Sequence, residues 1–494
     1  MSTPGPSVAP ATGKVIPIHA APEAGGHPRA EVISMYRREA TIYPREVGGR
    51  FATWRWVFVF LTQALFYGLP WWRWNGRQAV LFDLGSRRFY LFDLVLYPQD
   101  FIYLAVLLII CAYGLFLFTA VAGRVWCGFA CPQTVYSELF LWIERRWEGS
   151  RVRRMKLDRS AWTLDKTWRK GGKHATWLLL SLWTGFTFVG YFTPMDVLSH
   201  EVITASLGPW ELFWTGFYGL ATYGNAGFLR EQVCKYMCPY ARFQSAMFDR
   251  DTLIVTYDQA RGEPRGSRGR QVDARSKGQG DCIDCTLCVQ VCPTGIDIRQ
   301  GLQYECIGCA ACVDVCDSVM DKVGSPRGLI RHATHHALEN GWGRRQMLAR
   351  VMRPRVLIYS AVLLCIVLAF GASLFGRAPF SVNVLRDQGV LARLVEDGHI
   401  ENVYRVQIMN ATERDQRYRL RADHLPGSRL VAQDEITVGP AQTRWVPVSV
   451  RIGPELASSF GAGARPFDIV VVRQRQADWA DREVKERTTF MVPR

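Results

Sequence analysis

Five long apolar stretches are the feature that most restricts how this chain can fold. A helix needs about 20 mostly apolar residues to cross a bilayer, and such stretches lie at 54–72, 101–122, 175–193, 208–228 and 356–375. Tryptophan and tyrosine crowd their ends, as in the aromatic belts of membrane proteins. Buried helices of soluble proteins seldom run this long without a charge, so we predict a polytopic α-helical membrane protein with five transmembrane helices.

The distribution of Lys and Arg predicts the orientation of these helices. The loops 123–174 and 229–355 are rich in both residues, whereas the loop 194–207 contains neither. Because cytoplasmic loops carry the excess of positive charge, we place the N-terminus and both basic loops in the cytoplasm and the region after residue 376 in the periplasm of a bacterial inner membrane. The net charge of +16 then belongs to loops beside membrane lipid. No DNA-reading motif stands out, so we expect no nucleic-acid partner.

Composition divides the rest of the chain. Residues 1–50 are rich in Pro, Gly and Ala, and we predict a flexible cytoplasmic segment without a cleavable signal. Residues 51–250 form the predicted membrane domain with the first four spans, and residues 351–376 form the fifth. Apolar and polar residues alternate in 377–494, which predicts an all-β antiparallel sandwich. We expect this domain either to dock a partner or simply to anchor the fold.

The clearest motif lies in the second basic loop, where eight cysteines form two runs of Cys-x-x-Cys-x-x-Cys-x-x-x-Cys. In two-cluster bacterial ferredoxins with this spacing, the fourth cysteine of each run binds the other [4Fe–4S] cluster. We therefore predict an inserted α+β ferredoxin domain at 251–350 that holds two [4Fe–4S] clusters. Structural zinc sites, the alternative, use four ligands rather than eight. The expected ligands are Cys282, Cys285, Cys288 and Cys316 for one cluster, and Cys306, Cys309, Cys312 and Cys292 for the other.

Two further cysteine pairs follow the second and fourth apolar stretches in the motif Cys-x-x-x-Cys-Pro. Residues four apart share a helix face, and proline disfavours helical geometry at the residue before it, so each pair should present two sulfurs at the cytoplasmic membrane surface. Soft thiolates favour Cu(I), and basic neighbours such as Arg124, Arg230 and Lys235 should lower the thiol pKa values. A redox disulfide, another metal centre and simple packing are alternatives; packing is our prediction for the isolated Cys111 and Cys365. The candidate catalytic and copper-binding residues are Cys127, Cys131, Cys234 and Cys238.

Several stretches resemble the CcoG/RdxA/FixG family over about residues 30–494: WCGFACPQTVYSELF, EQVCKYMCPYARFQSAMFDRDTL, PRGLIRH and the double cysteine run. The resemblance implies a membrane-bound iron–sulfur protein with a periplasmic Ig-like domain that assists assembly of cbb-type cytochrome c oxidases. It also implies cupric reductase activity in copper delivery. Family members often carry Tyr where this chain has His332, followed by His335 and His336. We expect these histidines to begin a polar helix and do not count them as ligands.

These observations together predict a cupric reductase. Electrons from an unidentified cytoplasmic donor would enter at the two clusters and reduce Cu(II) to Cu(I), as substrate or bound ion, at the four paired cysteines. Copper chaperones or transporters and cbb-type oxidase assembly factors are the expected partners, and a homodimer is left open. The alternatives are a quinol- or flavin-linked membrane electron carrier and a non-enzymatic assembly scaffold. A redox-sensing transcription factor is disfavoured because no DNA-reading motif stands out.

Overall fold

The computed structural model describes residues 41–268, 278–387, 389, 392–474 and 482–493. Of the segment 1–50, which we predicted to be flexible, residues 1–40 lie outside this part of the chain. The residues just before the first helix are held by contacts, in contrast to that prediction. The Tyr43 hydroxyl donates to Asp158 at 2.7 Å, and Arg154 donates to the Pro44 carbonyl at 2.7 Å.

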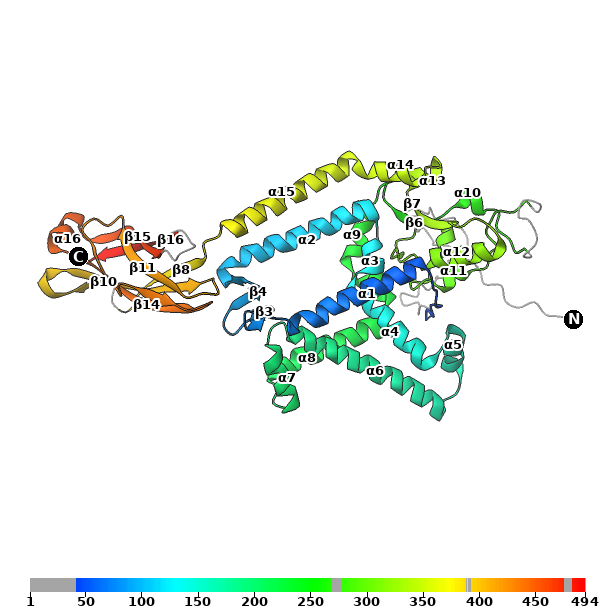
Figure 1. Cartoon of the computed structure of the whole chain (residues 1–494), viewed down its shortest axis with the longest axis horizontal. Coiled ribbons are helices and arrows are strands. Elements are labelled where there is room, and N and C mark those ends of the chain that lie inside the picture. The colour runs from blue at the N-terminus through cyan, green and yellow to red at the C-terminus, as the bar shows by residue number, and fades with distance from the viewer. Residues whose placement is uncertain (1–40, 269–277, 388, 390–391, 475–481, 494) are drawn as a thin grey trace, which may run out of the picture. The chain divides into compact units, whose positions relative to one another are not determined.

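A helix occupies each of the five apolar stretches. Among the described residues, two helical segments are long and apolar enough to cross a membrane, Pro98–Ala122 and Pro354–Gly376. These two run side by side (Figure 1), and the Tyr103 hydroxyl of the first donates to the Ser373 carbonyl of the second at 3.3 Å. The five helices are α1 (Arg50–Gly68), α2 (Phe101–Ala122), α6 (Leu164–Val189), α8 (Pro209–Thr222) and α15 (Pro354–Gly376).

Two details of these helices differ from the prediction. Helix α6 begins at Leu164, inside the expected loop, and α8 continues as a π-helix, η3 (Tyr223–Leu229).

Cys111 on α2 and Cys365 on α15 have exposed side chains. The packing role that we predicted for these two cysteines is therefore wrong, because they face away from the rest of the described chain.

The basic loop 123–174 is folded into helices. Within it, Glu144 pairs with Arg154 at 3.3 Å and with Arg230 at 2.9 Å, and the buried Glu148 pairs with Lys173 at 2.8 Å. Burial alone would raise the pKa of Glu144, but Arg230, Arg154 and Lys173 together hold it below its usual range. Part of the positive charge that predicted a cytoplasmic loop is thus neutralised inside it. The helices here are α3 (Val125–Phe129), α4 (Pro132–Glu148) and α5 (Arg151–Arg159).

Both cysteine runs lie between the two strands of a small antiparallel sheet, and we call this part of the chain the cysteine-rich region. Strand β6 (Ile254–Tyr257) pairs with β7 (Ile330–Ala333), so the chain leaves and returns at the same edge. The apolar core beneath the sheet includes Val255, Val313 and Met320. Cys288 lies in a short helix, Cys312 and Cys316 lie in a longer one, and the other five cysteines lie in loops. The described helices between the strands are α10 (Gln259–Gly262), α11 (Leu287–Gln290), η6 (Ile298–Gln300) and α12 (Ala311–Val323).

Helix α12 also binds the start of α1. The Asp314 carboxylate accepts the backbone N–H groups of Phe51 at 3.1 Å and Ala52 at 2.7 Å. The first turn of a helix has unpaired N–H groups and a positive dipole end, so a carboxylate is a favourable partner. This contact fixes the cysteine-rich region to the first apolar helix.

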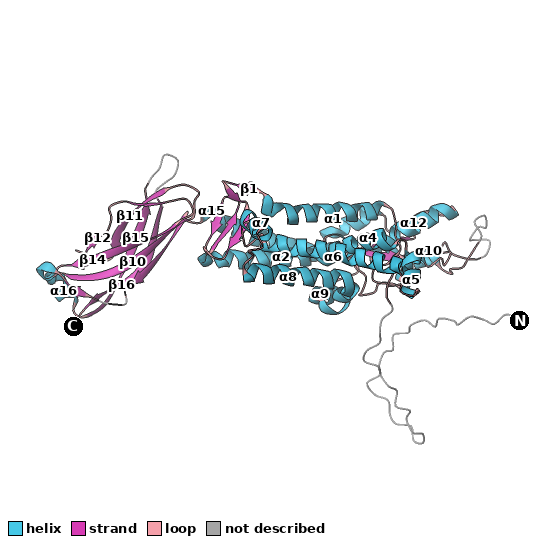
Figure 2. Cartoon of the chain, turned by 90° about the horizontal axis from the view of Figure 1, so that it is seen from below, coloured by secondary structure: helices cyan, strands magenta, loops and turns pink. Residues whose placement is uncertain are grey.

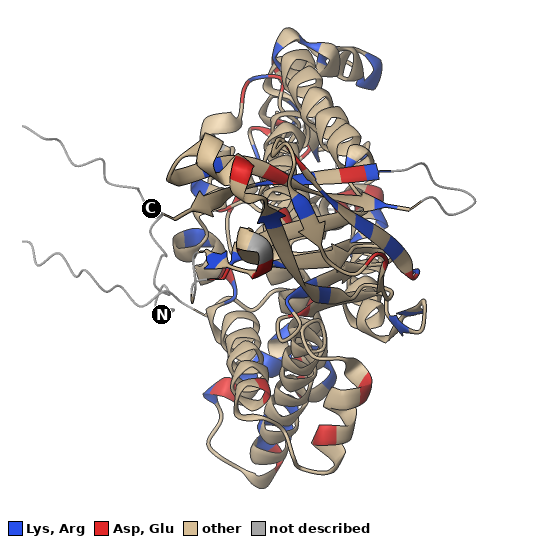
Figure 3. Ribbon diagram, turned by 90° about the vertical axis from the view of Figure 1, so that its left-hand side faces the viewer, with Lys and Arg blue, Asp and Glu red and all other residues tan. Residues whose placement is uncertain are grey.

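The C-terminal region is a β-sandwich, as the alternation predicted. One sheet has the order β12-β14-β10-β8 with β9 beside β10, and the other has the order β13-β11-β15-β16. Figure 2 shows these strands, and Figure 3 shows basic and acidic residues interspersed along them. The first sheet contains β8 (Phe380–Arg386), β9 (Arg393–Leu394), β10 (Ile400–Asn410), β12 (Arg429–Val431) and β14 (Thr443–Ile452). The second contains β11 (Gln416–Asp423), β13 (Ile436–Val438), β15 (Gly463–Arg473) and β16 (Arg482–Val492).

A strand-rich segment between α1 and α2 contacts this sandwich. The Tyr97 hydroxyl donates to the Asn410 carbonyl at 2.9 Å, and Arg77 pairs with Glu413. Tyr97 and Val95 share an apolar cluster with Met409. The segment consists of β1 (Arg73–Trp74), β2 (Arg77–Gln78), β3 (Val80–Asp83), β4 (Arg88–Leu91) and β5 (Leu94–Leu96).

Candidate functional site

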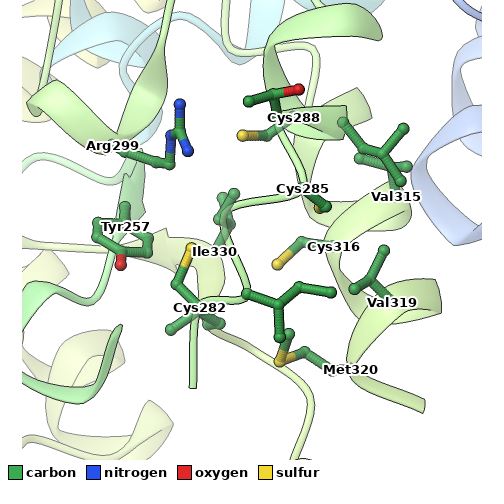
Figure 4. A pocket seen from close by; sticks show the side chains of 14 residues that line it. Tyr257, Cys282, Cys285, Cys288, Arg299, Val315, Cys316, Val319, Met320 and Ile330 are labelled. Atoms are coloured by element: carbon green, nitrogen blue, oxygen red, sulfur yellow. The ribbon is translucent and has the colours of Figure 1, made fainter. Parts of the chain in front are cut away.

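Four of the predicted cluster ligands line one cavity. Figure 4 shows Cys282, Cys288 and Cys316 with their sulfurs turned into it, and Arg299 at its edge. Cys285 also lines the cavity but is exposed, whereas Cys282 and Cys288 are buried. Three of these thiols come from one cysteine run and the fourth, Cys316, from helix α12 of the other run.

The other four predicted ligands line a second cavity, together with apolar side chains such as Val255 and Ile298. These thiols are Cys292, Cys306, Cys309 and Cys312. The cavity linings group the thiols as the spacing predicts, except that Cys288 lines both cavities. Among the described residues, no three His, Cys, Asp or Glu side chains converge closely enough for a single metal ion. Cavities with four thiols and otherwise mainly apolar walls fit an iron–sulfur cube, because each cysteine binds a different iron atom and the sulfurs stand further apart than around one ion.

Both cysteine runs turn in the same way around their second cysteine. In the first run Asp284 and Thr286 have φ of 52° and 56°, and in the second run Gly308 and Ala310 have φ of 69° and 57°. Three of these four residues are not glycine and adopt a left-handed conformation that is uncommon for them. The repeated turn brings three sulfurs of each run to one side of the chain.

The two Cys-x-x-x-Cys-Pro motifs also share one backbone conformation. Four residues before the first cysteine, Gly123 has φ 57° and ψ −124°, and Arg230 has φ 38° and ψ −108°. The amide of Cys131 donates to the Trp126 carbonyl at 3.0 Å, and that of Cys238 donates to the Val233 carbonyl at 2.8 Å. We call residues 123–132 and 230–239 the first and second thiol segments.

The helical presentation predicted for these pairs is only half right. The first cysteines are helical, Cys127 in α3 and Cys234 in a π-helix, η4 (Val233–Met237). Cys131 and Cys238 are extended and precede the proline-initiated helices α4 and α9 (Pro239–Met247). The prolines thus end the helices where predicted, and for this reason neither pair lies on one continuous helix face.

The two thiol segments meet in space. Arg124 donates to the Ala241 carbonyl at 2.9 Å, and the fully buried Gln244 on α9 donates to the Cys127 sulfur at 3.4 Å. Gln133 at the start of α4 donates to the Arg230 carbonyl at 3.1 Å. Gln244, on the helix that follows the second segment, therefore holds the first segment. Gln133, on the helix that follows the first segment, holds the second segment.

The predicted lowering of the thiol pKa values is wrong. Burial, and to a smaller extent the neighbouring thiols of Cys131 and Cys238, raise the pKa of Cys127 to about 11 and that of Cys234 to about 12. The positive charge of Arg124 acts in the opposite direction but is outweighed. Charge can be read from the sequence, whereas burial of the thiols cannot. The other three thiols also act electrostatically on Cys234, so the two pairs lie near one another, although no three of the described thiols converge closely enough for a single metal ion.

The first thiol segment packs directly on the second cysteine run. A Cβ atom added to Gly128 would lie 2.7 Å from both the Cα and the amide nitrogen of Cys309. In the same way, a Cβ atom on Gly308 would lie 3.0 Å from the carbonyl carbon of Arg124. Cys127 and Cys234 pack against the apolar cluster that contains Cys309. Only glycine permits two backbones to approach so closely, so Gly128 places the thiol segment against a predicted cluster ligand.

The three histidines have other contacts. His336 bonds to Asp251 at 2.8 Å, and the His332 ring lies 5.1 Å from that of Phe51. Helix α13 (His335–Glu339) begins at His335 and is capped by Thr334. Burial lowers the pKa of His332. His335 and His336 begin a helix as predicted, whereas His332 lies in strand β7, so the prediction is wrong for His332.

Known proteins resemble this chain over most of its length. Protein RdxB of Cereibacter sphaeroides is 42% identical over 391 residues, which are 78% of this chain and 82% of RdxB. Nitrogen fixation protein FixG of Rhizobium meliloti is 37% identical over 454 residues, 84% of this chain and 87% of FixG. The chain belongs to the FixG/RdxA/RdxB family. Protein RdxA of Cereibacter sphaeroides, another member of the family, is 40% identical over 80% of this chain and 85% of its own.

Family models agree with the domain composition. A 4Fe-4S dicluster domain matches residues 229–335, and the Ig-like fold at the C-terminus of FixG, described there as an oxidoreductase, matches residues 370–493. A second 4Fe-4S binding domain matches residues 104–150, which include Cys127 and Cys131. This member of the FixG family therefore contains 4Fe-4S binding domains and a C-terminal Ig-like β domain.

Sequence reasoning missed three residues that build the site: Gln244, Gly128 and Asp314. A glycine between two cysteines was an available signal for Gly128, because it permits a close backbone approach. Gln244 and Asp314 act on partners 117 and 262 residues away, Cys127 and Ala52. No local pattern could have identified those contacts.

Proposed function

We propose that this FixG-family protein is a cupric reductase that supplies Cu(I) for the assembly of cbb-type cytochrome c oxidase. The observation that carries the proposal is the contact of Gly128 with Cys309, which puts the first thiol segment beside one cysteine cavity, where Cys127 and Cys234 pack against the same apolar cluster. In the proposed assignment the cluster ligands are the two sets given above, Cys282, Cys285, Cys288 and Cys316, and Cys292, Cys306, Cys309 and Cys312. When bound, the clusters supply one-electron redox chemistry.

The paired thiols suit Cu(I) better than Cu(II). Soft sulfur ligands favour the reduced ion and therefore favour its formation from Cu(II). Because burial keeps the pKa values of Cys127 and Cys234 well above neutrality, copper must displace protons to bind there. One electron reduces one Cu(II) to Cu(I), and the displaced thiol protons are released. Gln244 donates to the Cys127 sulfur and orients it toward its neighbours.

The proposed membrane arrangement has five spans in a bacterial inner membrane, with the ferredoxin domain cytoplasmic and the sandwich periplasmic. Two observations support it. The strand-rich segment before α2 contacts the sandwich through Tyr97 and Asn410, as expected if both lie on one side of the membrane. The first thiol segment contacts the cysteine-rich region, as expected on the other side. Copper chaperones or transporters and oxidase assembly factors would receive the product.

An anaerobic experiment tests the proposed activity. The purified protein is reduced and mixed with Cu(II), and the recovery of cluster absorbance near 400 nm on oxidation is compared with Cu(I) trapped by a chelator. We expect one Cu(I) for each electron lost, and a much slower reaction in the Cys127/Cys131/Cys234/Cys238→Ser variant with its iron content intact. Equal rates in both proteins would contradict the proposal and favour a quinol- or flavin-linked carrier or an assembly scaffold.

A further inference from the structure

The two cysteine cavities differ in the charge around them. Arg299 lines the first cavity and is neutralised there. Its guanidinium pairs with Asp297 at 2.7 Å and also with Asp284. Two carboxylates therefore balance the charge of the arginine at the first cavity. The exposed Cys285 lines the same cavity.

Two arginines flank the second cavity without such partners. Arg124 is 7% exposed and donates to the carbonyl groups of Cys306 at 3.1 Å and Ala241 at 2.9 Å. Arg55 on α1 lies against Cys309, with which it interacts electrostatically. The Nε atoms of both arginines are buried and have no hydrogen-bond partner, and neither guanidinium forms an ion pair with a described residue.

The carboxylates nearest to Arg55 are engaged elsewhere. Glu138 lines the same cavity as Arg55 but pairs with Arg145 at 3.5 Å. Asp314 accepts the backbone N–H groups at the start of α1. Glu138 and Asp314 still attract Arg55 electrostatically, but no described carboxylate forms an ion pair with Arg55 or Arg124. Because a buried charge without a close partner is unfavourable, a negative charge near Cys306 and Cys309 would stabilise both arginines.

An iron–sulfur cube held by four thiolates is anionic and gains one more negative charge on reduction. Net charge and hydrogen bonds near the sulfurs set its reduction potential. We infer that Arg55 and Arg124 raise the potential of the cluster that Cys292, Cys306, Cys309 and Cys312 would hold above that of its partner. The exposed Cys285 would then mark the side at which a one-electron reductant of the ferredoxin or flavin class donates. The two arginines would favour the electron on the cluster beside Gly128.

A redox titration of the full-length holoprotein in detergent, followed by electron paramagnetic resonance and without copper, tests this inference. The wild type should show two separate one-electron steps. Arg55→Met should shift the upper step to lower potential and leave the lower step in place, whereas Arg55→Lys, which keeps the charge, should leave both nearly unchanged. Asp297→Asn should shift the lower step upward, because it exposes the charge of Arg299 while its amide oxygen can still cap η6.

Each outcome decides the inference. A single unresolved step in the wild type, a lower step that moves in Arg55→Met, or an upper step that moves in Asp297→Asn would overturn it. If Arg55→Met does not retain its iron, the Asp297→Asn result alone supports or overturns it. The inference rests on the ligand sets proposed above, but not on copper as the acceptor. Failure of copper reduction with the expected potentials would therefore contradict only the proposed function.

Discussion

The two thiol segments have the same backbone but face different surroundings. The first segment is covered by the cysteine-rich region, because Gly128 lies against Cys309. The second exposes Tyr236 and Met237, which are 56% and 59% accessible. The second segment also touches the cysteine-rich region, because Cys234 packs against the same apolar cluster as Cys127. The comparison shows that one repeated turn can be covered to different extents by its neighbours.

The segments also differ at the residue that begins the turn. Gly123 adopts the unusual φ and ψ without a steric penalty, whereas Arg230 adopts them with a side chain. For a residue other than glycine such a conformation costs on the order of 1–3 kcal/mol. Arg230 is held there by Glu144 at 2.9 Å and by the Gly227 carbonyl at 3.0 Å. The second segment therefore depends on a buried ion pair that the first does not need.

The largest expected effect comes from removing one cysteine pair at a time. If the two segments form one copper site, either Cys127/Cys131→Ser or Cys234/Cys238→Ser should abolish Cu(II) reduction, and changing all four residues should be no worse. Stopped-flow measurement of Cu(I) formation distinguishes the variants. Iron content should stay at the wild-type level, and Cys111→Ser on the exposed face of α2 is the matched control. Two half-active variants would show two independent sites.

Glu144→Gln tests the dependence of the second segment on its ion pair. The change leaves Arg154 and Arg230 buried without a carboxylate, which we expect to lower the free energy of unfolding by about 3–5 kcal/mol. Denaturant unfolding monitored by near-ultraviolet circular dichroism measures this loss. Arg169→Gln, which removes an exposed pair with Asp165, is the control and should have little effect.

The same ion pair predicts a dependence on pH. Although burial opposes it, Arg230, Arg154 and Lys173 hold the pKa of Glu144 below its ordinary value of 4.5. The stabilisation is therefore complete above that pH and is lost as the pH falls through the lowered pKa. The difference in stability between the wild type and Glu144→Gln should shrink on acidification. A difference that stays constant down to pH values well below about 4 would contradict the role of this carboxylate.

Gly128→Val should separate the first segment from the cysteine-rich region. The added side chain meets backbone atoms of Cys309, which cannot rotate away as a flexible side chain can. A displacement of about 1 Å can cost on the order of 100-fold in rate, and we expect a loss of this size in Cu(I) formation. Gly171→Ala on α6 meets nothing within 4 Å and serves as the control. An unchanged rate in Gly128→Val would show that the contact does not carry the electron.

Tyr304→Phe should have the smallest effect. It removes the hydroxyl that donates to the Lys235 carbonyl at 2.8 Å and so loosens the second segment from the cysteine-rich region. A hydrogen bond of this kind contributes about 1 kcal/mol. Hydrogen exchange measured by mass spectrometry should show slightly faster exchange near residue 235 and no change near residue 128. Equal changes at both positions would mean that the two segments are not held independently.

The grouping of three thiols within each run was predictable because the spacing inside a run is local, whereas the fourth thiol of each set comes from the other run. The chain turns around the second cysteine of each run, so a few consecutive residues already bring three sulfurs together. The helix ends at Cys131 and Cys238 were predictable for the same reason, from the prolines that follow them. The sandwich followed from the alternation along its strands, such as Tyr404, Val406 and Ile408, which are all buried.

The parts that could not be predicted depend on distant contacts. Burial decides the thiol pKa values, and the sequence shows the charge of Arg124 but not the surface that covers Cys127. The meeting of the two thiol segments rests on Gln244 and Gln133, whose partners lie far away in the sequence. The anchoring of residues just before α1, seen in the contact of Pro44 with Arg154, was hidden by a composition typical of flexible segments.

The interleaved cysteine sets have a consequence for the biogenesis of the protein. Each cavity takes its fourth thiol from the other run, so neither cavity is complete until β6 and β7 have paired around both runs. Insertion of iron into one half alone would leave an open coordination position in each cavity. Loading of the two clusters should accordingly be cooperative, and a newly made chain should pass from empty to fully loaded with few half-loaded molecules.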